Sequence, residues 1–175
     1  SHFDKDHVGS ASAILNSISV DHVLQSNYPK ESDVYTNYLS ALESCGITPE
    51  TVSGDMNISL GDMEIVVNGP EIIYDKNESN NSSLIVSLTY KNTSYLFMGD
   101  AENARIKDFV STNNNTYDFI KIPYHGNYLK RLDSLLSSVS PKYAVITASN
   151  EEGAEADTLA LLDNSNIKYY ITRDG

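Results

Sequence analysis

Two histidines and two aspartates lie within the first seven residues of the chain, as His2, Asp4, Asp6 and His7. Imidazole nitrogens and carboxylate oxygens are common ligands of zinc, manganese and iron. Because a short loop can bring nearby side chains to one point, we expect His2 and Asp4 to face one metal ion. Asp6 and His7 would face a second ion. Taken alone, the cluster has an alternative interpretation as a solvated acidic loop with two unrelated histidines.

Two more candidate ligands each follow a segment that is typical of a β-strand. Asp100 comes after the predicted strand at 95–98, and His125 comes after the predicted strand at 119–122. Loops at strand ends are where layered α/β domains place their sites. We expect Asp100 to bridge two ions, since a carboxylate can offer one oxygen to each. Without a cation, the converging carboxylates would repel one another and raise their own pKa values.

The composition is that of a globular chain with an acidic surface. Its 175 residues are an ordinary length for one compact unit, and we expect a single domain at 1–175. Acidic residues number 24 and basic residues 12, so the general surface should repel nucleic acid unless a bound metal offsets its charge. No apolar run approaches the ~18 residues of a membrane helix, and no signal-peptide pattern is visible, so we expect a soluble chain. The only cysteine, Cys45, excludes an intramolecular disulfide.

Hydrophobic periodicity predicts alternating strands and helices. The predicted helices lie at 9–17, 32–44, 101–110, 129–139 and 154–162. The predicted strands lie at 20–24, 63–67, 84–90, 95–98, 119–122, 143–147 and 168–172, with polar loops at 76–83 and 113–115. His22 lies inside the first of these strands, where we expect it on the solvated face. Strands followed by alternating helices and strands favour a layered α/β or α+β domain.

In five segments, taken in order, the sequence resembles the metallo-β-lactamase superfamily, and within it the hydrolase domain of ComEC-type DNA-uptake proteins. The segments are HFDKDH at 2–7, which is similar to the HxHxDH metal motif in its HxDxDH form, then NSSLIV at 81–86, LFMGDAE at 96–102, IPYHGN at 122–127 and ITRDG at 171–175. The matches span the chain from its first residue to its last. Their shared order makes the resemblance more specific than any one of them.

The resemblance implies a four-layer αββα sandwich with metal ions at the rim where two sheets meet. It also implies that His2 and Asp4 bind the first metal, that Asp6, His7 and His125 bind the second, and that Asp100 bridges the two. One or two divalent transition metals, zinc or manganese, would then convert a bound water to hydroxide near neutral pH. Asp6 would be the catalytic residue that orients this water.

Departures from the family pattern indicate that the first metal site is weaker than the second. Many family members supply a third histidine to the first metal, yet no histidine lies between His22 and His125. Asp4 also stands where the common motif has a histidine. An oxygen-rich first site favours manganese, magnesium or no ion over tightly bound zinc.

Three further residues are weaker candidates for substrate binding. Asn81 lies in the loop near the position of the missing ligand, and Tyr124 stands in place of the first histidine of the family's HHG segment. Tyr124 could donate from its phenol, although packing is the favoured interpretation. Asn127 precedes the helix predicted to begin near Leu129, where it could cap the helix or present backbone donors to an anion.

In the family, several strands precede the first metal motif, whereas here only Ser1 precedes His2. We therefore expect the sandwich to lack its N-terminal strands, and another segment or a partner chain to complete it. The segments 20–24 and 63–67 would then belong to a sheet whose neighbours are partly absent.

Two functions remain open from the sequence. The first is a metal-dependent hydrolase, most simply a phosphodiesterase or nuclease-like enzyme acting on DNA or a small phosphoester. The second is a binding or structural module that keeps the fold after its site has degenerated. The basic residues Lys121, Lys130 and Arg131 form only a small patch for DNA. The resemblance is compatible with an extracytoplasmic location, but the sequence does not fix the compartment.

Overall fold

The computed structural model describes residues 1–151 and 153–174, so Gly175 of the fifth motif lies outside the described residues. The strands are β1 (Leu24–Gln25), β2 (Glu50–Thr51), β3 (Gly54–Leu60), β4 (Met63–Gly69), β5 (Ile85–Tyr90), β6 (Thr93–Phe97), β7 (Phe119–Lys121), β8 (Tyr143–Ile146) and β9 (Lys168–Ile171). The helices are α1 (Lys5–Val8), α2 (Ala11–Ser17), α3 (Asp33–Cys45), α4 (Glu78–Asn81), α5 (Asn103–Thr112), α6 (Leu132–Val139) and α7 (Ala156–Asn164), with short 3₁₀ turns η1 (Tyr124–Gly126) and η2 (Thr172–Asp174).

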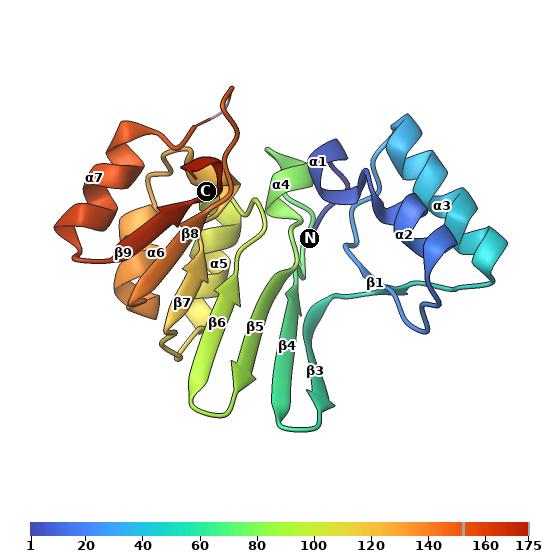
Figure 1. Cartoon of the computed structure of the whole chain (residues 1–175), viewed down its shortest axis with the longest axis horizontal. Coiled ribbons are helices and arrows are strands. Elements are labelled where there is room, and N and C mark those ends of the chain that lie inside the picture. The colour runs from blue at the N-terminus through green and yellow to red at the C-terminus, as the bar shows by residue number, and fades with distance from the viewer. Residues whose placement is uncertain (152, 175) are drawn as a thin grey trace.

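A seven-stranded sheet in the order β3-β4-β5-β6-β7-β8-β9 organises the chain (Figure 1). Strands β3 to β6 are antiparallel neighbours, and β6 to β9 run parallel. In the antiparallel half, tight turns join β3 to β4, where Leu60 pairs with Met63, and β5 to β6, whereas residues 70–84, which contain α4, join β4 to β5. The parallel half needs crossover connections, which contain α5, α6 and α7. All these parallel strands therefore end at the same edge of the sheet.

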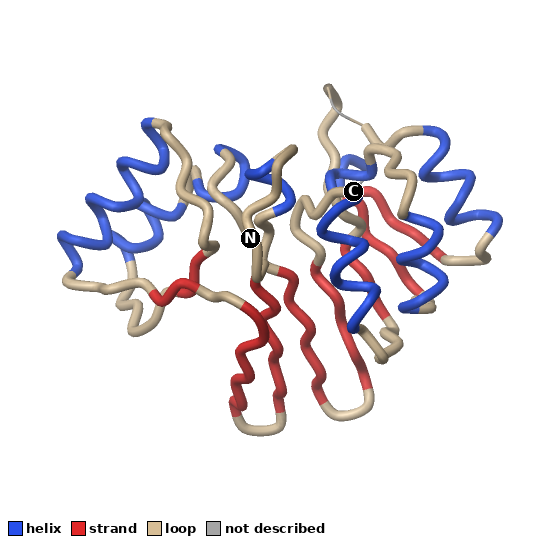
Figure 2. Tube along the Cα trace, turned by 180° about the vertical axis from the view of Figure 1, so that it is seen from behind, coloured by secondary structure: helices blue, strands red, loops and turns tan. Residues whose placement is uncertain are grey.

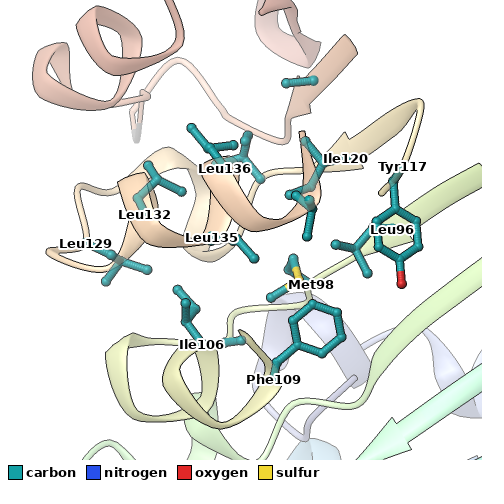
Figure 3. Close-up of a cluster of buried hydrophobic side chains, with 14 of the residues drawn as sticks. Leu96, Met98, Ile106, Phe109, Tyr117, Ile120, Leu129, Leu132, Leu135 and Leu136 are labelled. Atoms are coloured by element: carbon teal, nitrogen blue, oxygen red, sulfur yellow. The ribbon is translucent and has the colours of Figure 1, made fainter. Parts of the chain in front are cut away.

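Helices α5 and α6 lie on one face of this sheet, in front of the strands in Figure 2, and α7 adds the buried Leu162 to the same core. Leu96, Ile120 and Ala144 are register partners on β6, β7 and β8 and point to that face. They are fully buried against apolar side chains of the helices, including Ile106 of α5 and Leu135 of α6 (Figure 3). This core fixes the positions at which the parallel strands end.

The opposite face of the sheet carries aromatic side chains that remain accessible. Phe97, Tyr143 and Tyr170 are 40%, 45% and 51% exposed, and the Phe119 ring lies 5.8 Å from that of Tyr95. No helix of the described part of the chain covers this face in Figure 1. In sequence these residues alternate with the buried ones, as expected for a sheet with two different faces.

A smaller apolar cluster joins the N-terminal helices. Phe3, Leu15, Tyr38 and Leu42 are buried together, and they connect the opening segment to α2 and α3. Helix α3 begins after Ser32, whose Oγ accepts from the backbone N–H of Tyr35, and it ends at Gly46 in the left-handed conformation. The cluster therefore holds the opening segment, with its metal motif, against α2 and α3.

The expected mixed α/β class, with a large sheet and flanking helices, is confirmed. Among the described residues, the second sheet is limited to β1 and β2, which pair in parallel. No helix in the described ranges is both long and apolar enough to cross a membrane.

Several predictions of local structure were wrong. Residues 5–8 form helix α1 rather than a loop, because the carbonyl of Asp4 accepts from the N–H groups of His7 and Val8. The strand predicted at 20–24 is reduced to β1 and lies outside the large sheet. The strand predicted at 63–67 has both neighbours, because the mostly polar segment 54–60 forms β3 beside it.

Other boundaries shifted where polar residues obscured the pattern. The polar loop predicted at 76–83 contains α4, and the helix predicted at 129–139 begins at Leu132. Helix α3 and the hairpin of β5 and β6 agree with their predictions to within a few residues.

Truncation of the core should show how firmly the parallel strand ends are fixed. Ile120→Ala removes a fully buried side chain between the sheet and its helices, so the free energy of unfolding should fall by about 2–5 kcal/mol. Urea denaturation measures this loss. Ile14→Ala is the control, because Ile14 on α2 is 52% exposed and its truncation should cost about 0.5 kcal/mol or less. Equal losses in both variants would contradict this description of the core.

Candidate metal centre

Four side chains from three separate elements meet at the edge where the parallel strands end. Asp6 and His7 lie on α1, Asp100 follows β6, and His125 lies in η1 just after β7. One ligand atom from each residue lies within 4.8 Å of all the others, and the set could hold a metal ion. We call Asp6, His7, Asp100 and His125 the four-residue cluster.

The donor atoms of the four-residue cluster are spaced as metal ligands are. Oδ2 of Asp100 lies 3.1 Å from Nε2 of His7 and 3.1 Å from Nε2 of His125. Oδ2 of Asp6 lies 3.3 Å and 3.0 Å from the same two nitrogens. Ligands at ~2.0 Å from a zinc-sized ion in a tetrahedron are ~3.3 Å apart. The set therefore fits one divalent ion.

Each imidazole of the cluster uses Nδ1 for a hydrogen bond outside the cluster, so that Nε2 is the nitrogen that faces the cluster. Nδ1 of His125 donates to the carbonyl oxygen of Thr147 at 2.9 Å, so Nε2 is the nitrogen that can bind a metal ion after it releases its own proton. Nδ1 of His7 lies 2.9 Å from Oγ of Ser1. Nε2 of His7 is buried and has no hydrogen-bond partner among the described residues, as expected of an atom directed at a cation, and the same is true of Nε2 of the neighbouring His2.

An unusual backbone conformation aims His125 into the cluster. Tyr124 and His125 have φ of +49° and +53°, which non-glycine residues rarely adopt. The turn is closed by the N–H of Asn127, which donates to the carbonyl of Tyr124. Gly126 is required at its position, because a Cβ there would lie 2.8 Å from Ile146. Such conformations cost energy and cluster at functional sites.

The buried carboxylate of Asp100 is surrounded by basic side chains. Its side chain is only 5% exposed, and although burial favours the neutral acid, the adjacent His125, His7 and Lys121 hold the pKa well below its usual range. Contact with Asp100 in turn raises the pKa of His125 to about 9. The ammonium of Lys121 donates to Oδ1 of Asp100 and to the carbonyl of Gly99. Asp100 is therefore an ionised buried carboxylate that attracts positive charge.

His2 and Asp4 lie beside the four-residue cluster but do not belong to it. The His2 ring is 4.2 Å from that of His7, and burial lowers the pKa of His2 to about 4. Oδ1 of Asp4 lies 3.7 Å from Nε2 of His2, and it accepts hydrogen bonds from Nζ of Lys30 at 2.6 Å and from Oγ of Ser79. Four of the six predicted ligands thus converge, and this pair stands apart.

The weaker predictions have mixed outcomes. Asn81 is buried and bonds to the backbone of Lys76 and Arg105, so it shapes the loop rather than facing a substrate. Tyr124 lines a cavity of about 570 Å³ together with Asp100 and His125. Asn127 does not cap α6, whose N-cap is Arg131.

Sequence reasoning missed several residues that shape the centre. Lys30 and Ser79 contact Asp4, and Oγ of Ser83 accepts from the backbone N–H of Asp100. Lys30 is 26 residues from Asp4 in the chain, so no local pattern joins them. Thr147 follows β8 at the same edge as Asp100 and His125. Its place at the end of a predicted strand was the one feature of the sequence that could have indicated a role at the centre.

Comparison with known proteins gives a family match in sequence and several similar solved structures. The sequence model of the metallo-beta-lactamase superfamily matches residues 1–149. No curated protein matches the chain in sequence. The fold is similar to that of Igni18, a metallo hydrolase from the hyperthermophilic archaeon Ignicoccus hospitalis, at 13% identity and a TM-score of 0.59, covering 99% of this chain and 74% of Igni18. It is also similar to a mutant of the β-hydroxylase CmlA, at 16% identity and a TM-score of 0.57, covering 98% of this chain and 42% of CmlA.

The contact of His125 with Asp100 predicts pH-dependent stability in the metal-free protein. The pKa of His125 is about 9 in the folded chain against an ordinary 6.5. Protonated His125 therefore contributes fully to the free energy of unfolding below pH 6.5, and this contribution is lost as the pH rises to 9. Chelator-treated protein should lose roughly 1–3 kcal/mol of unfolding free energy across that window, measured by urea denaturation. His125→Gln should show a flatter profile, and an unchanged slope in this variant would contradict the assignment.

Proposed function

The chain belongs to the metallo-beta-lactamase superfamily, and on that premise we propose that it is a hydrolase whose catalytic metal ion is held by the four-residue cluster. The convergence of Asp6, His7, Asp100 and His125 is the main support for this proposal. Two imidazole nitrogens and two carboxylate oxygens meet at the carboxyl ends of β6 and β7 with the spacing of metal ligands. Open α/β sheets commonly bind ligands at this edge.

The protein's own groups support hydrolysis at this place. A divalent ion in the cluster would supply hydroxide near neutral pH by lowering the pKa of a water molecule. The Asp6 side chain is 59% exposed, so it can accept a hydrogen bond from that water and orient it toward a substrate. Lys121 holds Asp100 by its other oxygen and thereby keeps the metal-facing oxygen in position.

Open space beside the cluster can admit a substrate. One cavity of about 570 Å³ is lined by Asp4, Tyr124 and His125, and another of about 670 Å³ by Asp6, His125 and Thr147. A broader groove of about 1110 Å³ runs from Lys30 along α3. This arrangement suits an extended or charged substrate better than a small apolar one.

Phosphodiester hydrolysis is the activity that we propose. The motifs at 2–7 and 122–127 are similar to those of ComEC-type hydrolase domains, which favours DNA or a small phosphodiester as substrate. Ammonium groups of Lys30 and Lys121 lie beside the centre, where they would offset the charge of a phosphate on an otherwise acidic chain. Zinc and manganese are both compatible with two nitrogen and two oxygen ligands.

A second candidate is a binding or structural module with little catalysis. The observation that favours it is the state of the His2–Asp4 pair, where Lys30 and Ser79 already satisfy the Asp4 carboxylate. Turnover of a phosphodiester by the metal-loaded chain would exclude this alternative.

Removal of the metal or of its central ligand should abolish hydrolysis. The chain loaded with zinc or manganese should cleave bis(p-nitrophenyl) phosphate or single-stranded DNA, and chelation should reduce kcat/KM at least 10²-fold. Asp100→Ala should cause a similar loss because it removes the buried carboxylate. Asp133→Asn, an exposed acid on α6, is the matched control and should retain activity. Cleavage that persists after chelation or in Asp100→Ala would refute the proposal.

A further inference from the structure

The oxygen of Asp4 that a first metal ion would need is already occupied. Nζ of Lys30 lies 2.6 Å from Oδ1 of Asp4, and Oγ of Ser79 donates to the same atom. This oxygen is also the one nearest to His2, with Nε2 of His2 3.7 Å away. Nε2 of His2 is buried and has no hydrogen-bond partner among the described residues, so Lys30 occupies the carboxylate side of this position and not the histidine side. An ion between His2 and Asp4 would therefore compete directly with an ammonium group.

The position of Lys30 is held by the segment that carries it. Before Lys30, Oγ of the buried Ser26 donates to the carbonyl of Ser82 at 2.6 Å, and Nδ2 of Asn27 donates to the carbonyl of Pro70 at 3.0 Å. After it, Ser32 caps α3. The side chain of Lys30 is 37% exposed and that of Asp4 is 28% exposed, so the pair is partly screened from water. Lys30 is thus anchored on both sides and is not a free surface lysine.

The balance of charge differs between the His2–Asp4 pair and the four-residue cluster. Beside His2, one carboxylate from Asp4 faces one ammonium from Lys30, so the position is neutral without a metal. In the four-residue cluster, the carboxylates of Asp6 and Asp100 contact the imidazoles of His7 and His125, and Asp100 also contacts the ammonium of Lys121. A proton on an imidazole is released when a metal ion binds, whereas the ammonium of Lys30 keeps its charge. A divalent cation is therefore attracted to the cluster and is repelled by Lys30 at the neighbouring position.

We propose that the ammonium group of Lys30 replaces the first metal ion, so that this chain carries one metal centre where the family pattern has two. The inference rests on the proposed function in assigning the metal to the four-residue cluster. It goes further by naming the residue that excludes the second ion. Because an ammonium cannot acidify water as a divalent ion does, activation of the nucleophile is confined to the four-residue cluster.

Metal stoichiometry tests the replacement without any measurement of activity. The full chain is saturated with manganese, freed of excess ion, and analysed for metal content and by electron paramagnetic resonance. Wild type should hold one ion per chain with the spectrum of an isolated centre. Lys30→Met should hold two ions with a spin-coupled spectrum, because the Asp4 oxygen becomes available. Lys30→Arg should hold one, because it keeps the cation.

Lys142→Met is the matched control, because Lys142 forms an ammonium–carboxylate contact of 2.7 Å with Asp118 away from the cluster. It should hold one ion. Two ions in wild type, or one ion in a folded Lys30→Met, would overturn the replacement. If Lys30→Met does not fold, the wild-type spectrum alone decides, since a spin-coupled pair contradicts the proposal. One bound ion without hydrolysis would instead refute the proposed function and leave the replacement standing.

Discussion

The structure depends on keeping Asp100 ionised while its side chain is almost excluded from water. A buried carboxylate is unfavourable unless charged partners surround it. Here His7 and His125 contact one oxygen, and Lys121 contacts the other. These partners come from α1, η1 and β7, so the need to compensate one charge holds segments together that are distant in the chain. A divalent cation among them would satisfy the same need more completely, which is why the cluster is best understood as a metal centre.

The large sheet and the helices packed on it place Asp100 and His125 at one edge. The core between β6, β7 and the helices fixes where each parallel strand ends, and Asp100 and His125 follow within a few residues. On the other side, the buried guanidinium of Arg105 on α5 donates to the carbonyl oxygens of Asn68 and Ser83. Ser83 in turn accepts from the N–H of Asp100. Arg105 therefore links the loop before β5 to the metal edge, and Ser26 anchors the same loop by donating to the carbonyl of Ser82.

The sequence was informative where local patterns carry the structure. Ser32, the apolar stripe and Gly46 define α3, and alternating residues define β5 and β6. Asp100 and His125 were found because each follows a predicted strand. It was less informative where structure depends on distant partners: β3 has a polar face and needs β4 beside it. The contact of Lys30 with Asp4 could not be predicted for the same reason. Lys30 and Ser79 meet Asp4 only in the folded chain.

X-ray absorption at the zinc edge of the zinc-loaded chain would test the metal centre most directly. We expect a coordination sphere of two imidazoles with carboxylate and water oxygens at ~2.0–2.2 Å and no neighbouring metal. In His125→Ala the imidazole count should fall to one. A sphere without imidazole, or a second zinc within a few ångströms, would refute a single ion held by the four-residue cluster.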